Sequence, residues 1–424
     1  MSIIISLIII ILGGFSAIRI ILGLLLANIH QIIYLTKARK EKYAPLVSVI
    51  IPAYNEEKTI MACVSSVLKQ TYLNRQVIIV NDGSDDATKD ILDNIDKKLY
   101  SSNSVEQLFE DSIPYKERFI VVNQPNSGKS IALNNGIKNY AKGELITVLD
   151  ADSELKPNFL VNMIKHFQST NVVAVAANVR IKRAVNLIEL VQYIEYLVGY
   201  QLKSSEQVLN LEYIIGGIGS TFRRTIMEAV NLYDTDTVTE DIDLTMKLLR
   251  QFGNTSYKFC YAFNCIVFTP AVHNFKQLIK QRYRWKFGRF RALIKHRKLI
   301  FNKKLNLYSI TLSWWKLPKV FFEEFLLLIE PVILIWMSII ILIHCDFSII
   351  FSVLIIYFIF AIDTIIVESI STKAKLKLAL VSPFTYLFLY IINIVDFICL
   401  VRCIANFKEI LLKKGHSKWT HVER

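Results

Sequence analysis

Two aspartates separated by one small residue mark the most informative stretch of the sequence, ELITVLDADSELKPNF at 144–159. Asp150 and Asp152 follow the apolar run 145–149, and residues i and i+2 of an extended segment point to the same face, so the carboxylates can converge. Two close carboxylates repel each other unless a cation lies between them. Oxygen ligands suit Mg²⁺ or Mn²⁺, and substrate phosphates often complete the coordination of such an ion. The pair therefore predicts a divalent-metal site, although Asp152 and Ser153 also suit a simple helix cap.

Two turn motifs have the chemistry to hold a nucleoside diphosphate. In VNDGSDD, Asp82 and Gly83 follow an apolar run, and ligands of open α/β sheets bind at the carboxyl ends of strands. Asp82 would accept a hydrogen bond from a base N–H or a ribose hydroxyl; the alternative is turn formation alone. PNSGKSIALNNG places Lys129 in a turn before a helix, where an ammonium and backbone N–H groups suit a pyrophosphate. The alternative is a solvent-exposed lysine.

Five acidic residues lie between positions 234 and 243, in DTDTVTEDID. Thr237 and Glu240 match a capping box, in which Glu240 stabilises a helix N-terminus. One cap does not also need Asp241 and Asp243. A carboxylate held near a sugar hydroxyl serves as a general base, so these two aspartates are candidates for catalysis.

The basic segment 273–304 contains twelve Lys or Arg and no acid. Within it, Gln281, Arg284 and Trp285 occur together in QRYRW; Arg clamps phosphates with paired hydrogen bonds, and Trp stacks on sugar faces. The alternative is an interfacial helix with basic and aromatic anchors. Because the segment precedes an apolar block, and basic clusters beside spans mark the cytoplasmic side, the net charge of +14 indicates a membrane surface and not nucleic acid.

Short runs rich in Val and Ile must position these residues. They are LVSVIIP, QVIIVNDG, RFIVVNQ, ELITVLD and VVAVAANV, most of them followed by turn residues. Strands alternating with helices predict an α/β fold with a mainly parallel sheet, and the polar stretch 97–117 indicates an insertion or an extra helix. The sequence has no HxH, HExxH, GxSxG or CxxC motif, which argues against zinc-hydrolase, serine-hydrolase and dithiol chemistry.

An apolar N-terminal run, residues 2–34, predicts one long or tilted membrane helix, since a span needs about 20 apolar residues. It has no basic n-region and no clear cleavage site, so we expect an uncleaved anchor. Lys37, Arg39 and Lys40 follow it and predict a cytoplasmic location for the next domain.

Three further apolar runs follow the basic segment, at 320–344, 347–370 and 378–407. A lysine-rich loop before the third run is expected in the cytoplasm, and the third run itself forms either a hairpin or one span plus an interfacial helix. The chain thus divides into an N-terminal anchor (1–35), a globular domain (45–272), basic amphipathic interfacial helices (273–319), a C-terminal transmembrane region (320–407) and a cytoplasmic tail (408–424).

Taken in order, the motifs resemble those of processive, membrane-bound family-2 glycosyltransferases with a GT-A catalytic domain. The matching segments are VSVIIPAYNEE, QVIIVNDGSDD, NSGKSIALNNG, VLDADS, GGIGSTFRR, TEDIDLTMKL and QRYRW, over about residues 46–290. The chain is most similar to bacterial poly-β-1,6-N-acetylglucosamine synthases, through TEDIDL and KWTHVER. Hyaluronan, chitin and cellulose synthases share the core motifs. Only one N-terminal anchor is predicted, whereas relatives often have two. The architecture of a polymer channel in the membrane region is therefore left open.

The resemblance implies a GT-A, Rossmann-like nucleotide-diphospho-sugar transferase fold and a donor site at its sheet edge. Tyr54 would stack on uracil with Glu56 nearby, and Asp82 would bind the uridine. Lys129 would support the nucleotide-sugar. Asp150 would contact both the nucleotide and the metal, Mg²⁺ or Mn²⁺.

The resemblance also assigns the remaining site residues. Asp152 would be the direct metal ligand, and Asp241 the general base, charged but weakly basic because a helix N-terminus favours the ionised form. GGIGSTFRR would border the acceptor sugar, and Trp419 would belong to a gating segment. The residues implied to complete the substrate site around the pyrophosphate and acceptor are Glu240, Gln281, Arg284 and Trp285.

The function implied is an inverting, processive polymerisation of a β-linked polysaccharide, such as a biofilm exopolysaccharide, from a UDP-sugar, with UDP-N-acetylglucosamine as the best candidate. The resemblance places the enzyme in the cell membrane with a cytoplasmic catalytic domain, and the polymer leaves through the membrane region. Alternatives are a hyaluronan-, chitin- or cellulose-type synthase, a non-processive transferase acting on a lipid acceptor, and an inactive scaffold. An accessory subunit for activation or export is a further alternative.

Overall fold

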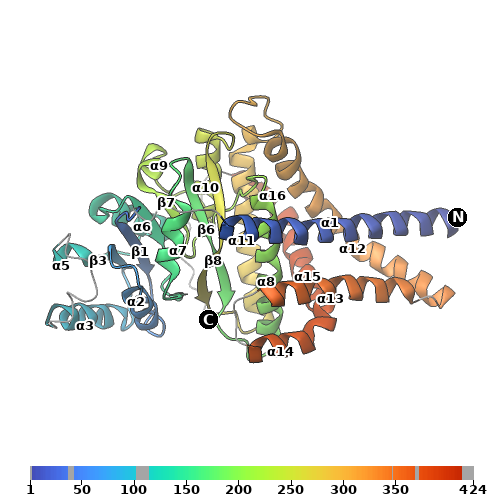
Figure 1. Ribbon diagram of the computed structural model, residues 1–424, viewed down its shortest axis with the longest axis horizontal. Coiled ribbons are helices and arrows are strands. Elements are labelled where there is room, and N and C mark those ends of the chain that lie inside the picture. The colour runs from blue at the N-terminus through green and yellow to red at the C-terminus, as the bar shows by residue number, and fades with distance from the viewer. Residues whose placement is uncertain (1, 37–42, 102–113, 346, 368–371, 413–424) are drawn as a thin grey trace.

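A mixed sheet of eight strands forms the centre of the globular domain (Figure 1). The computed structural model describes residues 2–36, 43–101, 114–345, 347–367 and 372–412. Residues 102–113 of the predicted insertion, and Trp419, lie outside the described residues. The strands are β1 (Val47–Ala53), β2 (Arg75–Asp82), β3 (Phe119–Gln124), β4 (Leu145–Val148), β5 (Glu154–Leu155), β6 (Val172–Ile181), β7 (Thr221–Arg223) and β8 (Lys258–Thr269).

The strand order is β3-β2-β1-β4-β7-β6-β8-β5. β1 runs parallel to β2 and β4, β2 to β3, and β6 to β8. β7 pairs antiparallel with β4 and β6, and β5 with β8. The five predicted strands are confirmed, whereas β5, β7 and β8 were not predicted. β5 and β7 have two and three residues, which is too short for a period-2 pattern to be recognised.

Helices cover both faces of the sheet, because alternate residues of each buried strand point to opposite faces. Ile50 of β1 packs in the same core as Leu133, while Ile51 packs with Val64 in the core on the other face. The helices of this domain are α2 (Ile60–Leu68), α3 (Thr88–Ser101), α5 (Tyr115–Arg118), α6 (Lys129–Asn135), α7 (Phe159–His166), α8 (Leu187–Gln207), α9 (Arg224–Ala229), α10 (Glu240–Phe252) and α11 (Phe275–Lys295).

α8 and α11 connect this domain to the apolar C-terminal helices. Each begins after an asparagine whose side chain accepts a backbone N–H of the first turn: Asn186 from Glu189, and Asn274 from Gln277. Their apolar faces meet α15 (Thr385–Ala405). The buried residues that they share are Val191, Val272, Leu278, Ile392, Val395 and Cys399.

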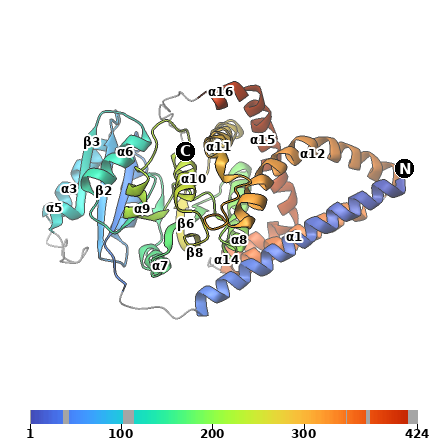
Figure 2. The same ribbon diagram turned by 90° about the horizontal axis from the view of Figure 1, so that it is seen from above.

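Four helical segments of the described chain are long and apolar enough to cross a membrane: Ile18–Thr36, Thr311–His344, Ile350–Val367 and Thr372–Ala405. The first segment is the C-terminal part of α1 (Ser2–Thr36), and the second contains α12 (Leu317–His344). The third lies in α13 (Ser348–Val367), and the fourth contains α14 (Thr372–Val381) and α15. Figures 1 and 2 show α1, α12 and α13 projecting from the sheet on one side. Phe322 and Leu342 of α12 are 58% and 71% exposed, and an exposed apolar surface on a helix long enough to span a bilayer suits contact with lipid. A membrane location therefore follows from the helices.

The third C-terminal apolar run forms α14, a 3-10 turn at Ser382–Phe384 and α15. Pro383 lies in that turn, where its missing N–H and fixed φ separate the two helices. Together they make one candidate span. Lys373, Lys375 and Lys377, the lysines of the predicted loop before the third run, lie on α14. The loop prediction is therefore wrong, and the cytoplasmic location of this segment stays a prediction.

Gly253, which caps the end of α10, is expected not to tolerate a side chain. Its φ of +69° belongs to a region that L-residues rarely adopt, and an added Cβ would lie 2.0 Å from the carbonyl oxygen of Leu307. Gly253→Ala should lower the free energy of unfolding by roughly 1–3 kcal/mol, seen as a lower Tm in detergent. The control is Gly199→Ala on α8, where nothing lies within 4 Å of the added Cβ; equal losses in both variants would contradict this reading.

Candidate active site

The predicted donor-site residues gather at one edge of the sheet. Tyr54 and Glu56 follow β1, and Asp82 is the last residue of β2. Asp150 and Asp152 follow β4. Because β1, β2 and β4 are parallel, their carboxyl ends share one edge, which is why residues nearly 100 positions apart meet there.

A cavity of about 390 Å³ opens beside this edge. The predicted site residues that line it are Lys129, Asp150, Glu240, Asp241, Arg284 and Trp285. Gly216, Gly217 and Ser220 of the GGIGS segment, predicted to border the acceptor, also line it. The predicted residues that do not line this cavity are Tyr54, Glu56, Asp82, Asp152 and Gln281.

Lys129 connects the two acidic motifs. Its ammonium lies 2.7 Å from Asp150 Oδ1 and 2.8 Å from Glu240 Oε1. Burial alone would lower the pKa of Lys129, but the two carboxylates outweigh it and hold the pKa above the ordinary value. The solvent-exposed alternative for Lys129 is therefore wrong: the lysine is a fixed positive charge between the end of β4 and the start of α10.

Asp82 holds the turn that presents Lys129. Its carboxylate is fully buried and accepts hydrogen bonds from Gln124 Nε2, Ser127 N and Gly128 N at 2.7, 2.9 and 2.8 Å. Gly128, with a φ of +96°, directly precedes α6 and Lys129. Asp82 thus has a positioning role in the protein itself, and its contact with a nucleoside stays a prediction.

Tyr54 and Glu56 begin the loop between β1 and α2. Glu56 accepts a hydrogen bond from the Thr59 hydroxyl at 2.6 Å, and its backbone N–H donates to Thr88. These bonds fix the loop against the start of α3. Stacking of Tyr54 on a base stays a prediction.

Asp241 lies in the first turn of α10, with its carboxylate held by backbone N–H groups. Oδ2 accepts from Gly217 N and Oδ1 from Ile242 N, each at 2.9 Å. Burial and the adjacent Glu240 carboxylate raise the pKa of Asp241 to about 6, against the effect of Lys129. The prediction that the helix N-terminus would make Asp241 a weak base is therefore wrong, since loss of hydration and a like charge outweigh the helix dipole.

The predicted capping box of Thr237 and Glu240 does not form. α10 begins at Glu240, and Thr239 is its N-cap without a side-chain cap bond. Thr237 instead donates to the Thr239 carbonyl at 3.3 Å. The Glu240 carboxylate pairs with Lys129.

Asp243, the second candidate base, is buried in an ion cluster away from the cavity. His296 Nε2 lies 2.9 Å from its Oδ1, and Lys295 Nζ lies 2.9 Å from its Oδ2. Lys295 also pairs with Asp234. Asp243 therefore ties α10 to the end of α11 and leaves Asp241 as the candidate base in the cavity.

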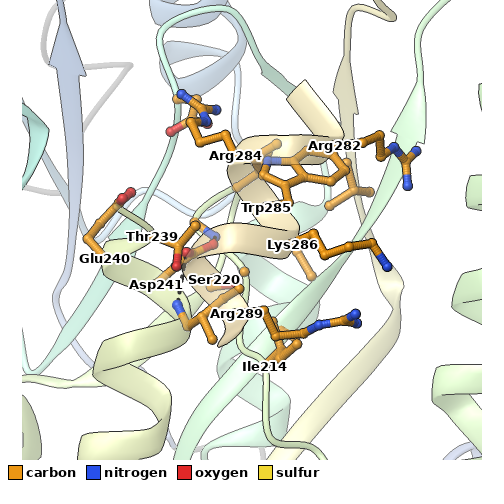
Figure 3. Close-up of a pocket in the computed structure, with 18 of the residues that line it drawn as sticks. Ile214, Ser220, Thr239, Glu240, Asp241, Arg282, Arg284, Trp285, Lys286 and Arg289 are labelled. Atoms are coloured by element: carbon orange, nitrogen blue, oxygen red, sulfur yellow. Dashed lines mark hydrogen bonds between the residues drawn. The ribbon is translucent and has the colours of Figure 1, made fainter. Parts of the chain in front are cut away.

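α11 covers the cavity with Arg284 and Trp285, while Gln281 of the same motif points into a buried position. The guanidinium of Arg282 lies 4.8 Å from the Trp285 ring centroid and binds Glu195 through two hydrogen bonds. This stacking orients the indole at the cavity. Figure 3 shows Asp241 on one side of Trp285, with Arg282 on the other.

Four basic residues that line the cavity were not predicted: Lys203 of α8 and three residues of α11. Arg282, Lys286 and Arg289 lie on α11, and Lys286 and Arg289 share the buried carboxylate of Glu324 from α12. Their i, i+4, i+7 spacing places them on one helix face. The spacing can be read in the sequence. However, basic residues occur all around α11, so the sequence alone does not indicate which of its faces lines a cavity.

Asp150 and Asp152 offer oxygen ligands that fit a Mg²⁺ or Mn²⁺ ion. Asp152 Oδ1 accepts a hydrogen bond from the Ser153 hydroxyl at 2.8 Å, which orients the carboxylate. Within the described part of the chain, no group of three or more His, Cys, Asp or Glu side chains could hold a metal. At a site with these two carboxylates, water and substrate phosphates would have to supply the remaining ligands of such an ion.

A Rossmann-like mixed sheet with a cavity at its carboxyl edge, lined by both carboxylates and basic side chains, is typical of the GT-A class of nucleotide-sugar transferases. The glycosyl transferase family 2 model matches residues 48–230, and the glycosyl transferase family group 2 model matches residues 145–411. The second match spans more than half of the chain, so the chain belongs to glycosyl transferase family group 2. The predicted family and enzyme class are confirmed.

Curated relatives include the poly-beta-1,6-N-acetyl-D-glucosamine synthase of Staphylococcus epidermidis, 30% identical over 268 residues, which are 62% of this chain and 60% of the relative. The synthase of the same name from Staphylococcus aureus strain COL is 30% identical over 253 residues, 59% of this chain and 56% of the relative. The chain thus matches less than two thirds of these relatives.

Among solved structures, a mannosyltransferase from Pyrobaculum calidifontis in complex with GDP-Man and Mn²⁺ has a TM-score of 0.56 and 18% identity. The match covers 96% of this chain and 99% of that one. It supports the fold.

Gly288 of α11 is expected to control how closely this helix approaches Asp241. An added Cβ would lie 2.4 Å from the Thr239 side chain. Gly288→Ala should displace Arg284 and Trp285 from the base and lower turnover by up to about 100-fold, as a misplacement near 1 Å does. Initial rates of nucleotide release would measure this.

A second substitution separates this contact from general damage. Thr239→Gly removes the clashing side chain at a small cost for an N-cap, and in the double variant it should restore most of the activity. Equal losses in the single and double variants would contradict the role of this contact.

Proposed function

We propose that the chain is a processive, inverting glycosyltransferase that polymerises a β-linked polysaccharide from a UDP-sugar, with UDP-N-acetylglucosamine giving poly-N-acetylglucosamine. The observation that carries the proposal is a single partly buried base, Asp241, beside the Lys129 bridge between Asp150 and Glu240. The names of the staphylococcal relatives support this choice of sugar.

The donor would bind along the sheet edge. Tyr54 and Glu56 would meet the nucleoside, and Asp82 would hold the turn beneath it. Lys129 and Arg284 would bring positive charge to the diphosphate. Asp150 and Asp152 would hold Mg²⁺ or Mn²⁺, which neutralises charge that develops on the leaving phosphate.

Asp241 would accept the proton of the acceptor hydroxyl as that oxygen attacks the anomeric carbon. The bond from the anomeric carbon to the diphosphate breaks as the new bond forms, and UDP leaves with the bonding electron pair. One displacement of this kind inverts an α-linked donor to a β-linkage. The backbone N–H groups of Gly217 and Ile242 donate to the Asp241 carboxylate and fix its orientation toward the cavity.

The acceptor would lie under α11 and beside α8. Trp285 from α11, with Tyr196 and Tyr200 from α8, supplies aromatic rings to the cavity wall, and such rings stack on sugar faces. Asp396 also lines the cavity. Because Asp396 belongs to α15, which is part of a candidate span, the cavity lies against the membrane region. This continuity supports a polymer that leaves through the membrane region, with the catalytic domain in the cytoplasm as the basic flanks indicate.

The test is UDP release by purified full-length protein in detergent with Mg²⁺ or Mn²⁺. UDP-N-acetylglucosamine alone should support turnover and give long polymer. Asp241→Asn should lower the rate by roughly 10²–10⁴-fold because the amide cannot accept the proton. Asp236→Asn, an exposed acid of the same segment, is the matched control and should keep full activity.

The donors also separate the alternatives. A requirement for UDP-glucuronate as well would indicate a hyaluronan-type enzyme, and turnover with UDP-glucose alone would indicate a cellulose-type enzyme. Transfer of a single sugar to lipid would refute processivity. No turnover by folded protein with any donor would refute the proposed donors.

The pH dependence should report Asp241. Its pKa is raised to about 6, so kcat/KM should fall tenfold per pH unit as the pH drops below about 6, because the protonated carboxyl accepts no proton.

The raised pKa of Asp241 also means that the fold disfavours the ionised carboxylate. The contribution of Asp241 to the free energy of unfolding therefore decreases as the pH rises from 3.8 to about 6. Asp241→Asn should therefore be at least as stable as the parent at pH 8, measured by Tm; a destabilised variant would attribute the lost activity to unfolding.

A further inference from the structure

A second cavity, of about 230 Å³, lies beside β6 and shares no lining residue with the catalytic cavity. Ala176, Ala177 and Val179 of this strand line the catalytic cavity, whereas Asn178 and Arg180 line the second one. The second cavity is therefore separate from the donor and acceptor site.

The side chains of this cavity have a consistent chemistry. Lys156 and Arg180 contribute two positive charges, and no lining residue carries a carboxylate. Phe159, Tyr261 and Phe263 contribute aromatic surface. The carboxamides that line it are Gln31, Asn158, Asn162, Asn178, Gln201 and Asn264. Carboxamides both donate to and accept from hydroxyl groups, and the cations select for an anion.

Two of these residues have polar groups that no described residue satisfies. Asn178 is 2% exposed; its Nδ2 donates to the Phe263 carbonyl at 2.7 Å, but its Oδ1 has no partner among the described residues. Within the same part of the chain, no ion pair or hydrogen bond involves the Lys156 ammonium. Buried polar groups are normally paired, so a bound hydroxyl accounts for the Asn178 oxygen. The Lys156 ammonium is partly exposed and is open to an anion.

The cavity lies where two candidate spans end. Gln31 belongs to the last turns of α1, and Val367 is the final residue of α13. Gln31 donates to Gln201 of α8, which donates to Asn28 of α1. A ligand there would contact both candidate spans and the sheet, and lipid headgroups lie where spans end.

We propose that this cavity binds a phosphate ester of a small polyhydroxylated group, supplied either by an anionic lipid headgroup such as glycerophosphate or by a free sugar phosphate. Lys156 pairs with the phosphate, and Asn162 and Asn178 bond the hydroxyls. The volume is small beside the roughly 300–1,000 Å³ of pockets that hold drug-sized ligands, so one headgroup or one sugar fits. This site is independent of the proposed donor and product.

The test uses full-length protein in uncharged detergent, stripped of lipid and saturated with UDP and Mg²⁺ to block the catalytic cavity. Short-chain phosphatidylglycerol and N-acetylglucosamine 6-phosphate are titrated separately, with inorganic phosphate, N-acetylglucosamine and short-chain phosphatidylcholine as controls. Binding is measured by calorimetry. Lys156→Met removes the half-exposed cation without touching the core, and Lys138→Met, an exposed lysine far from the cavity, is the matched loss of charge.

We expect one of the two phosphate esters to bind and Lys156→Met to weaken it about tenfold, as the loss of one charge-assisted hydrogen bond does. Lys138→Met should have no effect. Binding of phosphatidylglycerol identifies a lipid source, and binding of the sugar phosphate a soluble one. Asn178→Ala should weaken the same ligand while the Tm without ligand shows that it folds. Absence of binding by both esters, or equal weakening in the two lysine variants, overturns the proposal.

Discussion

The ion pairs of Lys129 with Asp150 and Glu240 are the interaction on which the site depends. Without a cation between them, the carboxylates at the end of β4 and at the start of α10 would repel each other across the cavity. Lys129 is itself held by Asp82, which binds the turn before α6. Strand ends that are distant in sequence thus become one charged surface suited to a diphosphate.

The same cluster sets the chemistry of Asp241. A helix N-terminus favours a charged carboxylate, but burial and Glu240 prevail and raise its pKa to about 6. A base with a pKa near working pH accepts a proton more effectively than an ordinary aspartate. Two backbone N–H groups keep the carboxylate in place, so basicity and orientation arise from the same loop packing.

α11 couples this chemistry to the membrane region. One face presents Trp285 to the cavity, stacked on Arg282, which is paired with Glu195 of α8. Lys286 and Arg289 of the same face pair with Glu324 of α12. Buried charges are stable only when paired. The position of α11 over Asp241 therefore depends on α8 and on α12, and α12 belongs to a candidate span.

The sequence by itself determined five of the eight strands, the apolar spans and the order of the acidic and basic motifs around the site, because strand-like apolar runs, long apolar runs and motif spacing are local properties. Only the tertiary structure decided that Asp243 is structural, since its partners Lys295 and His296 lie some fifty residues away. It also decided the pKa of Asp241 and the face that α11 presents. These depend on burial and on charges from other elements, which local spacing does not encode.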